Sequence, residues 1–259
     1  MTWPFDPSRP VVTPEDNAEY MRGRAGLSEA QWALPSTLVA TFQPQSWQRL
    51  ASRCDLAEAG PGPMVQPLRG HIQGAPIAAA RMMIGAPAAA ITVENAIARG
   101  VRNVLVVGSA GSLRSDLPIG SAVLVAGAER EDGTSHHYLP MGEVVEADAA
   151  LSERLDHHAR ARGLRPIRGR AWTIDAPFRE TAAAVRRHRE AGVLVVEMEA
   201  AAMFAVARVR GVRAALLVSV SDELSAPIWR PGFDDQHYLS TLAAGAEAVL
   251  DCAVELLGA

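Results

Sequence analysis

The stretch Val195-Val196-Glu197-Met198-Glu199-Ala200-Ala201-Ala202 decides the fold, because an apolar run passes there directly into a helix. Residues 194–196 are typical of a short buried strand, and residues 200–210 have the composition of a helix that Gly211 would end. Open α/β sheets usually place ligand-binding groups at such strand-to-helix junctions. The stretch therefore predicts an α/β fold with a site at this junction.

Two carboxylates, Glu197 and Glu199, lie at the junction. Their spacing alone allows two interpretations. They are acidic residues of the kind that the helix macrodipole favours at an N-terminus, or they form a sugar site. Buried carboxylates accept hydrogen bonds from vicinal hydroxyls and stabilise a cationic sugar in a transition state.

A second strand-like run ends in another carboxylate about one element later. Residues 214–220 are apolar and are followed by Ser221-Asp222. If the two strands are neighbours in the sheet, Asp222 lies next to the first pair of carboxylates. A carboxyl in that place would serve as a general acid.

These motifs carry a resemblance to a known family. Glu197-Met198-Glu199, followed by Ser221-Asp222 and preceded by the glycine turn Val107-Gly108-Ser109-Ala110-Gly111, resembles the nucleoside phosphorylase and nucleosidase superfamily. That superfamily includes purine nucleoside phosphorylase, uridine phosphorylase and methylthioadenosine nucleosidase. The resemblance covers roughly residues 35–257.

The resemblance implies an α/β fold with a single domain of three layers, α/β/α, around a central mixed and partly barrel-like β-sheet. This domain would span residues 35–259, and residues 1–34 would form an N-terminal arm. One short helix is expected in the arm after Thr13, which would cap it, with Pro14 at its first position. Further strands are expected at residues 38–42, 76–84, 104–107 and 121–126, and helices at residues 88–99 and 236–257.

For the sugar, the resemblance implies a site made by three consecutive residues. Glu199, helped by Glu197, would hold the ribose hydroxyls and favour positive charge on the sugar, so Glu199 is a predicted catalytic residue. Met198 would pack against the ribose. No metal and no organic cofactor is implied.

For the base, the resemblance points to the segment of residues 170–180, where a strand passes into a loop. Phe178 would stack on the base and Arg179 would read its edge. Pro177 stands where uridine phosphorylases have a glutamine, which disfavours uracil. In the alternative interpretation, Arg179 is a surface residue paired with Glu180 or Asp175.

Ser221 and Asp222 would complete the base site. In purine-cleaving members the matching aspartate protonates purine N7, or hydrogen-bonds to it, as the glycosidic bond breaks. Asp222 is therefore the second predicted catalytic residue, and a purine leaving group is favoured. Proton delivery of this kind contributes roughly 10²–10⁴-fold in rate.

The phosphate site of phosphorylases is the part that this chain does not match. Their Gly-Asp-Pro-x-Arg loop corresponds to Phe42-Gln43-Pro44-Gln45-Ser46, and their arginine before the glycine turn corresponds to Val106. Guanidinium groups supply the charge-assisted bonds that hold a phosphate dianion. Only the turn residues Gly108 and Ser109, with Arg230 as a possible replacement cation, remain as candidate anion contacts.

The composition is that of an ordinary globular protein. The chain has 259 residues, 49% of them hydrophobic, and a formal net charge of −4, which suggests neither nucleic-acid nor membrane binding. All 25 basic residues are arginine, so mechanisms that need a lysine are excluded. Cys54 and Cys252 match no metal or redox spacing, and with no apolar run of ~20 residues a cytoplasmic location is expected.

Together these features predict cleavage of the N-glycosidic bond of a nucleoside, by water or by phosphate in an atypical site. The alternatives are a phosphorylase with a non-standard phosphate site, a biosynthetic enzyme for a modified nucleoside or nucleotide, and a catalytically silent nucleoside-binding protein. The family resemblance implies a homo-oligomer, as a dimer, a trimer of dimers or a hexamer.

Overall fold

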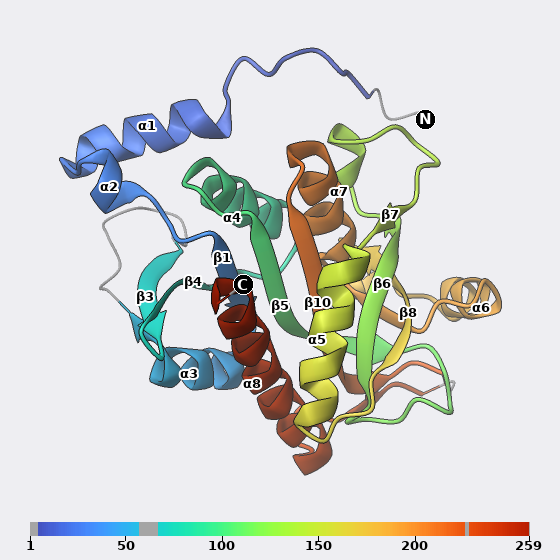
Figure 1. Cartoon of the computed structure of the whole chain (residues 1–259). Helices are drawn as coiled ribbons and strands as arrows, with labels where there is room; N and C mark the ends of the chain where they lie inside the picture. Colours follow the sequence, from blue (N-terminus) through green and yellow to red (C-terminus); the bar gives the residue numbers. More distant parts are fainter. Residues whose placement is uncertain (1–4, 57–66, 226–227, 259) are drawn as a thin grey trace.

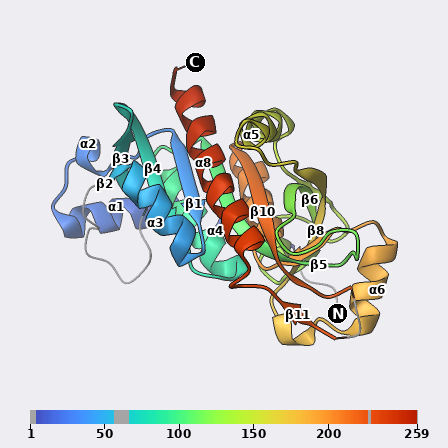
Figure 2. The same cartoon turned by 90° about the horizontal axis from the view of Figure 1, so that it is seen from below.

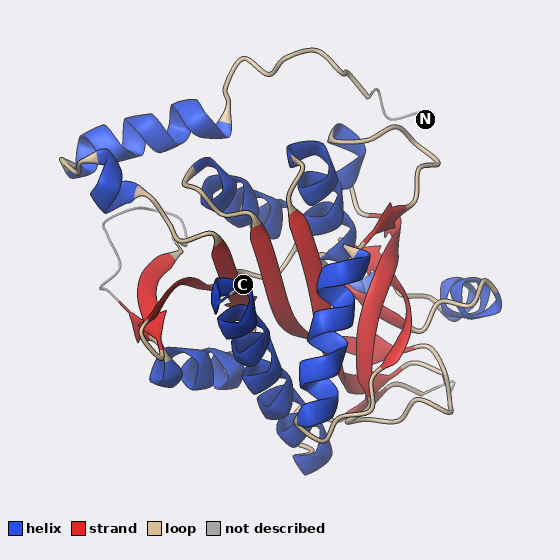
Figure 3. Cartoon of the chain, in the orientation of Figure 1, coloured by secondary structure: helices blue, strands red, loops and turns tan. Residues whose placement is uncertain are grey.

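One mixed β-sheet with helices on both faces forms the body of the protein (Figure 1, Figure 3). The structure is a computed structural model and describes residues 5–56, 67–225 and 228–258. The strands are β1 (Thr37–Thr41), β2 (Asp55–Leu56), β3 (Leu68–Ile72), β4 (Ala75–Arg81), β5 (Asn103–Ser112), β6 (Ala122–Glu131), β7 (Val145–Glu146), β8 (Ile167–Ile174), β9 (Val195–Glu197), β10 (Arg213–Glu223) and β11 (Arg230–Pro231). The helices are α1 (Pro14–Ala25), α2 (Glu29–Trp32), α3 (Pro44–Arg53), α4 (Ala86–Ala98), α5 (Ala149–Ala161), α6 (Ala182–Glu190), α7 (Ala200–Arg210) and α8 (Gln236–Gly258), with short 3₁₀ helices η1 (Ser135–His137) and η2 (Pro177–Arg179).

Part of the sheet closes on itself. The strands follow the order β11-β10-β6-β8-β9-β5-β1-β4-β3-β2, and β10 pairs with β5 as well as with β6. The five strands β5, β10, β6, β8 and β9 therefore form a ring, while β1, β4, β3 and β2 continue from β5 as an open sheet (Figure 2). The predicted mixed, partly barrel-like sheet is confirmed.

The central strands divide their side chains between two cores, because successive residues of a strand point to opposite faces. In β5, Val104 and Val106 belong to the core that includes the buried faces of α4 and α7. Leu105 and Val107 belong to the core that includes α3, α5 and α8. The predicted three-layer α/β/α arrangement follows from this alternation and is confirmed.

The glycine stretch at residues 107–111 lies inside β5, so the predicted turn is wrong. The strand stays extended there because it pairs with β10 on one side and with β1 and then β9 on the other. Gly111 is needed for close packing rather than for a turn. A Cβ at this position would lie 2.4 Å from Leu224 Cδ1 and 3.1 Å from Asp222 Oδ2.

β10 also differs from its prediction. It does not end at Ser221-Asp222 but continues to Glu223. β9 and β10 are not neighbours, because β5 lies between them and pairs with both. Asp222 is in register with Gly111, and Gly111 is in register with Val196. The two acidic motifs thus face each other across one strand.

The helix that follows the acidic stretch was predicted correctly. α7 runs from Ala200 to Arg210, and Gly211 ends it in the left-handed conformation with a φ of 65°. The strand predicted at residues 76–84 ends at Arg81, and the helix predicted to begin at residue 88 begins at Ala86.

The N-terminal segment contains two helices, of which only α1 was predicted. Thr13 caps α1, as expected, and forms a reciprocal capping box with Asp16. α1 packs on α4, where the Asn17 amide donates a 2.8 Å hydrogen bond to Asn95 Oδ1. Residues 1–4 of the predicted arm lie outside the described residues.

In the part of the chain that the structure describes, no helix has the length and apolar character that crossing a membrane requires. The cytoplasmic location stays a prediction. Cys54 and Cys252 are both buried and unpaired.

Candidate active site

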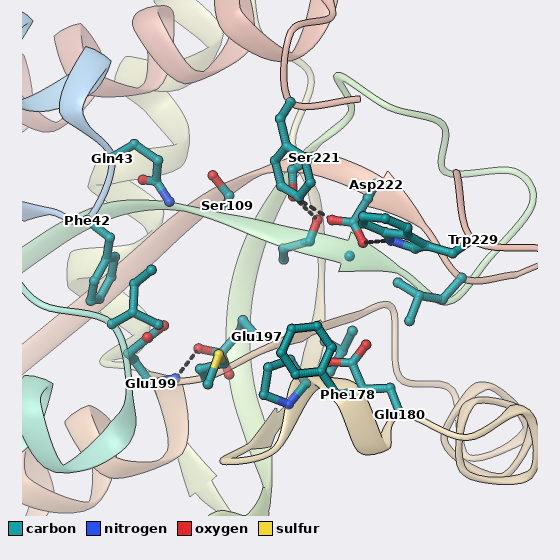
Figure 4. Close-up of a pocket in the computed structure, with 18 residues that line it drawn as sticks. Phe42, Gln43, Ser109, Phe178, Glu180, Glu197, Glu199, Ser221, Asp222 and Trp229 are labelled. Atoms are coloured by element: carbon teal, nitrogen blue, oxygen red, sulfur yellow. Dashed lines mark hydrogen bonds between the residues drawn. The ribbon is translucent and has the colours of Figure 1, made fainter. Parts of the chain in front are cut away.

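A cavity of about 610 Å³ opens where β1, β5, β8, β9 and β10 reach their carboxyl ends (Figure 4). It is lined by Phe42, Gln43, Ile84, Ser109, Ala110, Gly111, Pro177, Phe178, Glu180, Val196, Glu197, Met198, Glu199, Ser221, Asp222, Leu224, Trp229 and Phe233. The cavity therefore brings together the acidic stretch, the Ser-Asp pair and the glycine stretch, which are far apart in the sequence.

Glu197 is held by the start of α7. Its Oε2 accepts hydrogen bonds from the backbone N–H groups of Glu199, at 2.7 Å, and Ala200, at 2.6 Å. Its Oε1 accepts a hydrogen bond from the Thr173 hydroxyl, whose oxygen in turn accepts the Ala201 N–H at 3.0 Å. Burial raises the pKa of Glu197, and these donors oppose that rise. The helix-terminus interpretation thus describes Glu197.

Glu199 differs from Glu197 although only one residue separates them. It is the N-cap residue of α7, but its side chain does not cap the helix. Its Oε1 accepts the Gly85 N–H at 2.6 Å, and its carboxyl lines the cavity. Burial, and then the negative charge of Glu197, raise the pKa of Glu199. Glu199 is therefore the member of the pair that is available to a ligand, with Met198 beside it.

Asp222 is held from two sides at the other end of the cavity. Its Oδ1 accepts a hydrogen bond from the Ser221 hydroxyl at 2.7 Å, and its Oδ2 accepts one from the Trp229 indole N–H at 2.8 Å. Trp229 was not among the predicted site residues, although the sequence favours a loop at residues 229–233 that would cover the site. Its role as a donor depends on β11, which pairs with β10 and returns the chain toward Asp222.

Glu180 is a cavity residue that the sequence analysis did not place there. It follows η2, and burial followed by the charge of Asp222 raises its pKa to about 7. In the sequence it appeared only as a partner for Arg179. Its position directly after the predicted base-binding residues was the one available signal.

The predicted arginines do not line the cavity. Arg179 is exposed, and Arg230 forms a 2.9 Å ion pair with Glu223. Phe178 lines the mouth of the cavity, and its side chain is fully exposed. Of the glycine stretch, Gly108 packs beneath the cavity against Phe42 and does not line it.

Neutral side chains line the end of the cavity near β1 and β5, beside Glu199 (Figure 4). Phe42, Gln43 and Ile84 line it together with Ser109, whose hydroxyl is 2.7 Å from the Tyr238 hydroxyl. Four described lining residues of the whole cavity are carboxylic acids, and none of those described is Arg, Lys or His. Residues 1–4, 57–66, 226–227 and 259, which fall outside the description, contain no Arg, Lys or His in the sequence.

Among the described residues, no group of three or more His, Cys, Asp or Glu side chains is arranged to hold a metal ion.

The fold and the cavity define an α/β protein with a closed five-strand ring and an acid-lined site at its strand ends. The chain belongs to the Phosphorylase superfamily, whose family model matches residues 55–257. The family resemblance of the acidic and Ser-Asp motifs is thereby confirmed.

Curated relatives agree with this membership. The chain is 27% identical over 165 residues to uridine phosphorylase of Haemophilus influenzae, a match that covers 58% of this chain and 66% of the relative. It is 34% identical over 143 residues to guanosine phosphorylase of Halorubrum lacusprofundi, covering 55% of this chain and 59% of the relative. The matches therefore span somewhat less than two thirds of these two relatives.

Solved structures share the fold over nearly the whole chain. Uridine phosphorylase from Vibrio fischeri superposes with a TM-score of 0.77 at 21% identity, covering 91% of this chain and 99% of the other. Purine nucleoside phosphorylase from Toxoplasma gondii, solved with immucillin-H, also gives 0.77, at 16% identity and with 90% and 95% covered. At these identities the likeness establishes the fold alone.

Proposed function

We propose that the protein is an enzyme that cleaves the N-glycosidic bond of a nucleoside, with a purine as the favoured leaving group and water as the acceptor. The observation that carries this proposal is the acid-lined cavity, which offers one available carboxylate for ribose and two at the base end. Relatives named uridine phosphorylase and guanosine phosphorylase support a nucleoside as substrate.

The sugar is assigned to the end of the cavity near Glu199. The Glu199 carboxylate would accept hydrogen bonds from the vicinal ribose hydroxyls, and Met198 would pack against the ring. As the glycosidic bond breaks, positive charge develops on the sugar, and fixed negative charge nearby lowers the energy of that state. Glu197 supports this by holding the start of α7, through its bonds to the Glu199 and Ala200 N–H groups.

The base is assigned to the opposite end, between Phe178 and Trp229 (Figure 4). These aromatic side chains offer surfaces for a planar ring. Ser221, Asp222 and Glu180 offer polar groups that would bind the edge of the ring or donate a proton to it. Two carboxyls at this end favour a base with a protonatable ring nitrogen, as a purine has at N7.

Water is proposed as the acceptor because the cavity disfavours an anion. A phosphate dianion would meet the charge of the carboxylates, and no cation of the described lining residues compensates it. Gln43 and Ser109 are neutral groups that would hydrogen-bond a water molecule near the sugar carbon. A phosphorylase is the second candidate, because both curated relatives carry that name.

The test is base release from purine and pyrimidine nucleosides, each measured with and without phosphate. Release from purine nucleosides at a rate independent of phosphate is the expected result. Release that requires phosphate would replace hydrolysis with phosphorolysis. Tight nucleoside binding without release would contradict both and favour a binding protein or an enzyme with a different substrate chemistry.

A homo-oligomer is part of the same proposal. The arm leaves a second cavity of about 900 Å³ between its residues 5–17 and the body. Val12 lines this cavity and is 73% exposed, and Val11 next to it is 99% exposed. Apolar arm residues that do not pack on their own body would be buried by a second copy.

A further inference from the structure

The two carboxyls at the base end of the cavity differ in their hydrogen bonds. Asp222 accepts the Ser221 hydroxyl with one oxygen and the Trp229 indole N–H with the other. The Glu180 carboxyl accepts no hydrogen bond from any side chain or backbone group of the described residues. One acid is thus fully held by donors and the other is free to meet a ligand.

This difference bears on the charge state of Glu180. Hydrogen bonds donated to a carboxylate stabilise its charged form, and Glu180 receives none from the described residues. Glu180 is partly buried and has the negative charge of Asp222 close to it, and these two effects raise its pKa to about 7. Glu180 therefore keeps its proton closer to neutral pH than an exposed glutamate does.

Glu180 also stands in the right part of the cavity. It lies beside Phe178 and on the side of Asp222 and Trp229, away from Glu199 (Figure 4). With the ribose at Glu199, the base reaches this end. A protonated carboxyl there faces the leaving group rather than the sugar.

We infer that Glu180, rather than Asp222, is the catalytic acid that protonates the leaving base. This inference rests on the proposed glycosidic cleavage. The C1′–N9 bond breaks and its electron pair remains on the purine, while the Glu180 proton passes to N7. The oxygen of water bonds to C1′ and releases its proton to solvent, from which Glu180 is reprotonated. Asp222 acts as a positioning residue that keeps the proton on Glu180 and holds Trp229.

The experiment compares guanosine with 7-methylguanosine, whose ring already carries a positive charge and leaves without a proton at N7. Glu180→Gln should lower kcat/KM for guanosine by about 10²-fold or more and that for 7-methylguanosine by less than about 10-fold. Asp222→Asn should keep more guanosine activity than Glu180→Gln. Glu190→Gln, the same change at an exposed residue of α6, is the matched control and should alter neither rate.

The outcomes are separable. The assignment is wrong, while the proposed function stands, if Glu180→Gln keeps kcat/KM for guanosine within about 3-fold of the wild type. It is also wrong if the variant lowers kcat/KM for guanosine and 7-methylguanosine equally. If Asp222→Asn instead shows the selective loss, Asp222 is the acid. A wild-type protein that releases base from neither nucleoside overturns the proposed function and this inference with it. Thermal unfolding of each variant, with Glu180→Asp as a second replacement, separates lost chemistry from lost fold.

Discussion

At the scale of single residues, Glu197 and Glu199 show how one position in the chain changes the role of a carboxylate. Glu197 turns toward the free N–H groups of α7 and toward Thr173, and these donors satisfy its charge. Glu199 is turned away from the helix axis and meets the Gly85 N–H and the cavity. The helix-terminus interpretation therefore describes Glu197, and the sugar-binding interpretation stays a proposal for Glu199.

Replacing Glu199 by Gln should weaken ribose binding by about 10- to 100-fold, because a hydrogen bond to a charged acceptor contributes about 1.5–3 kcal/mol. The measurement is the dissociation constant of a carbocyclic nucleoside, which is not cleaved. A 2′,3′-dideoxy analogue is the control, since it should bind both proteins equally. Equal affinity of the two proteins for the hydroxylated analogue would contradict the ribose role.

The same residue predicts how binding depends on pH. Burial and the charge of Glu197 raise the pKa of Glu199, so its neutral form persists above the ordinary carboxyl range. A nucleoside whose hydroxyls donate to Glu199 binds the ionised form. Relative to Glu199→Gln, which keeps the titration of Glu180, the affinity of the wild type should therefore increase as pH rises through the raised pKa of Glu199 and then level off. Calorimetric titration between about pH 6 and 9 checks this, and a fall in affinity with rising pH would contradict it.

At the scale of elements, the start of α7 is held by groups from β8 and β9 rather than by its own N-cap. Thr173 of β8 is fully buried, donates to Glu197 and accepts the Ala201 N–H. Thr173→Val keeps the shape and removes both bonds, so it should lower the free energy of unfolding by about 1–3 kcal/mol. It should also reduce nucleoside affinity, because Glu199 is the N-cap residue of this helix and would move with its first turn. Chemical denaturation measures the first effect, and unchanged stability would show that the pair does not hold the helix.

The strand β5 makes a second prediction at this scale. Gly111→Ala should displace Asp222 and Leu224, because its Cβ would lie 2.4 Å from Leu224 Cδ1 and 3.1 Å from Asp222 Oδ2. Overpacking of this kind lowers the free energy of unfolding by about 1–3 kcal/mol. We also expect the folded variant to release base more slowly than the wild type, because Asp222 is displaced. Gly108→Ala is the matched control, since its Cβ would meet nothing nearer than 3.5 Å. Similar behaviour of the two variants would show that the glycines are interchangeable.

At the scale of the whole molecule, closure of the ring decides where the acids meet. β5 pairs with β10 and β9 at once, and β8 brings the segment with Phe178 and Glu180 to the same end. Contacts between residues close in the sequence could not bring these acids together, because Glu180, Glu199 and Asp222 come from three different elements. The site exists only once the sheet has closed.

Assembly is the prediction that belongs to this scale. The mass in solution should be a multiple of 27.5 kDa, because Val11 and Val12 of the arm are exposed and a second copy would bury them. Replacing both Val11 and Val12 by Ser should lower that mass or weaken the assembly. Light scattering coupled to gel filtration measures it, and a monomeric wild type would contradict the proposed homo-oligomer.

The sequence by itself determined the fold class, the bounds of α7, the start of α1 and the family. The bounds of α7 and the start of α1 follow from local physics, namely a capping residue before a helix and a glycine after it. The family and the barrel-like sheet were implied by the resemblance of the acidic and Ser-Asp motifs. Only the tertiary structure decided that the glycine stretch is a strand and that Arg179 and Arg230 stay outside the cavity. It also decided that Glu180 enters the cavity. These outcomes depend on which strands pair across the ring, and such partners lie far apart in the chain, where no local pattern reports them.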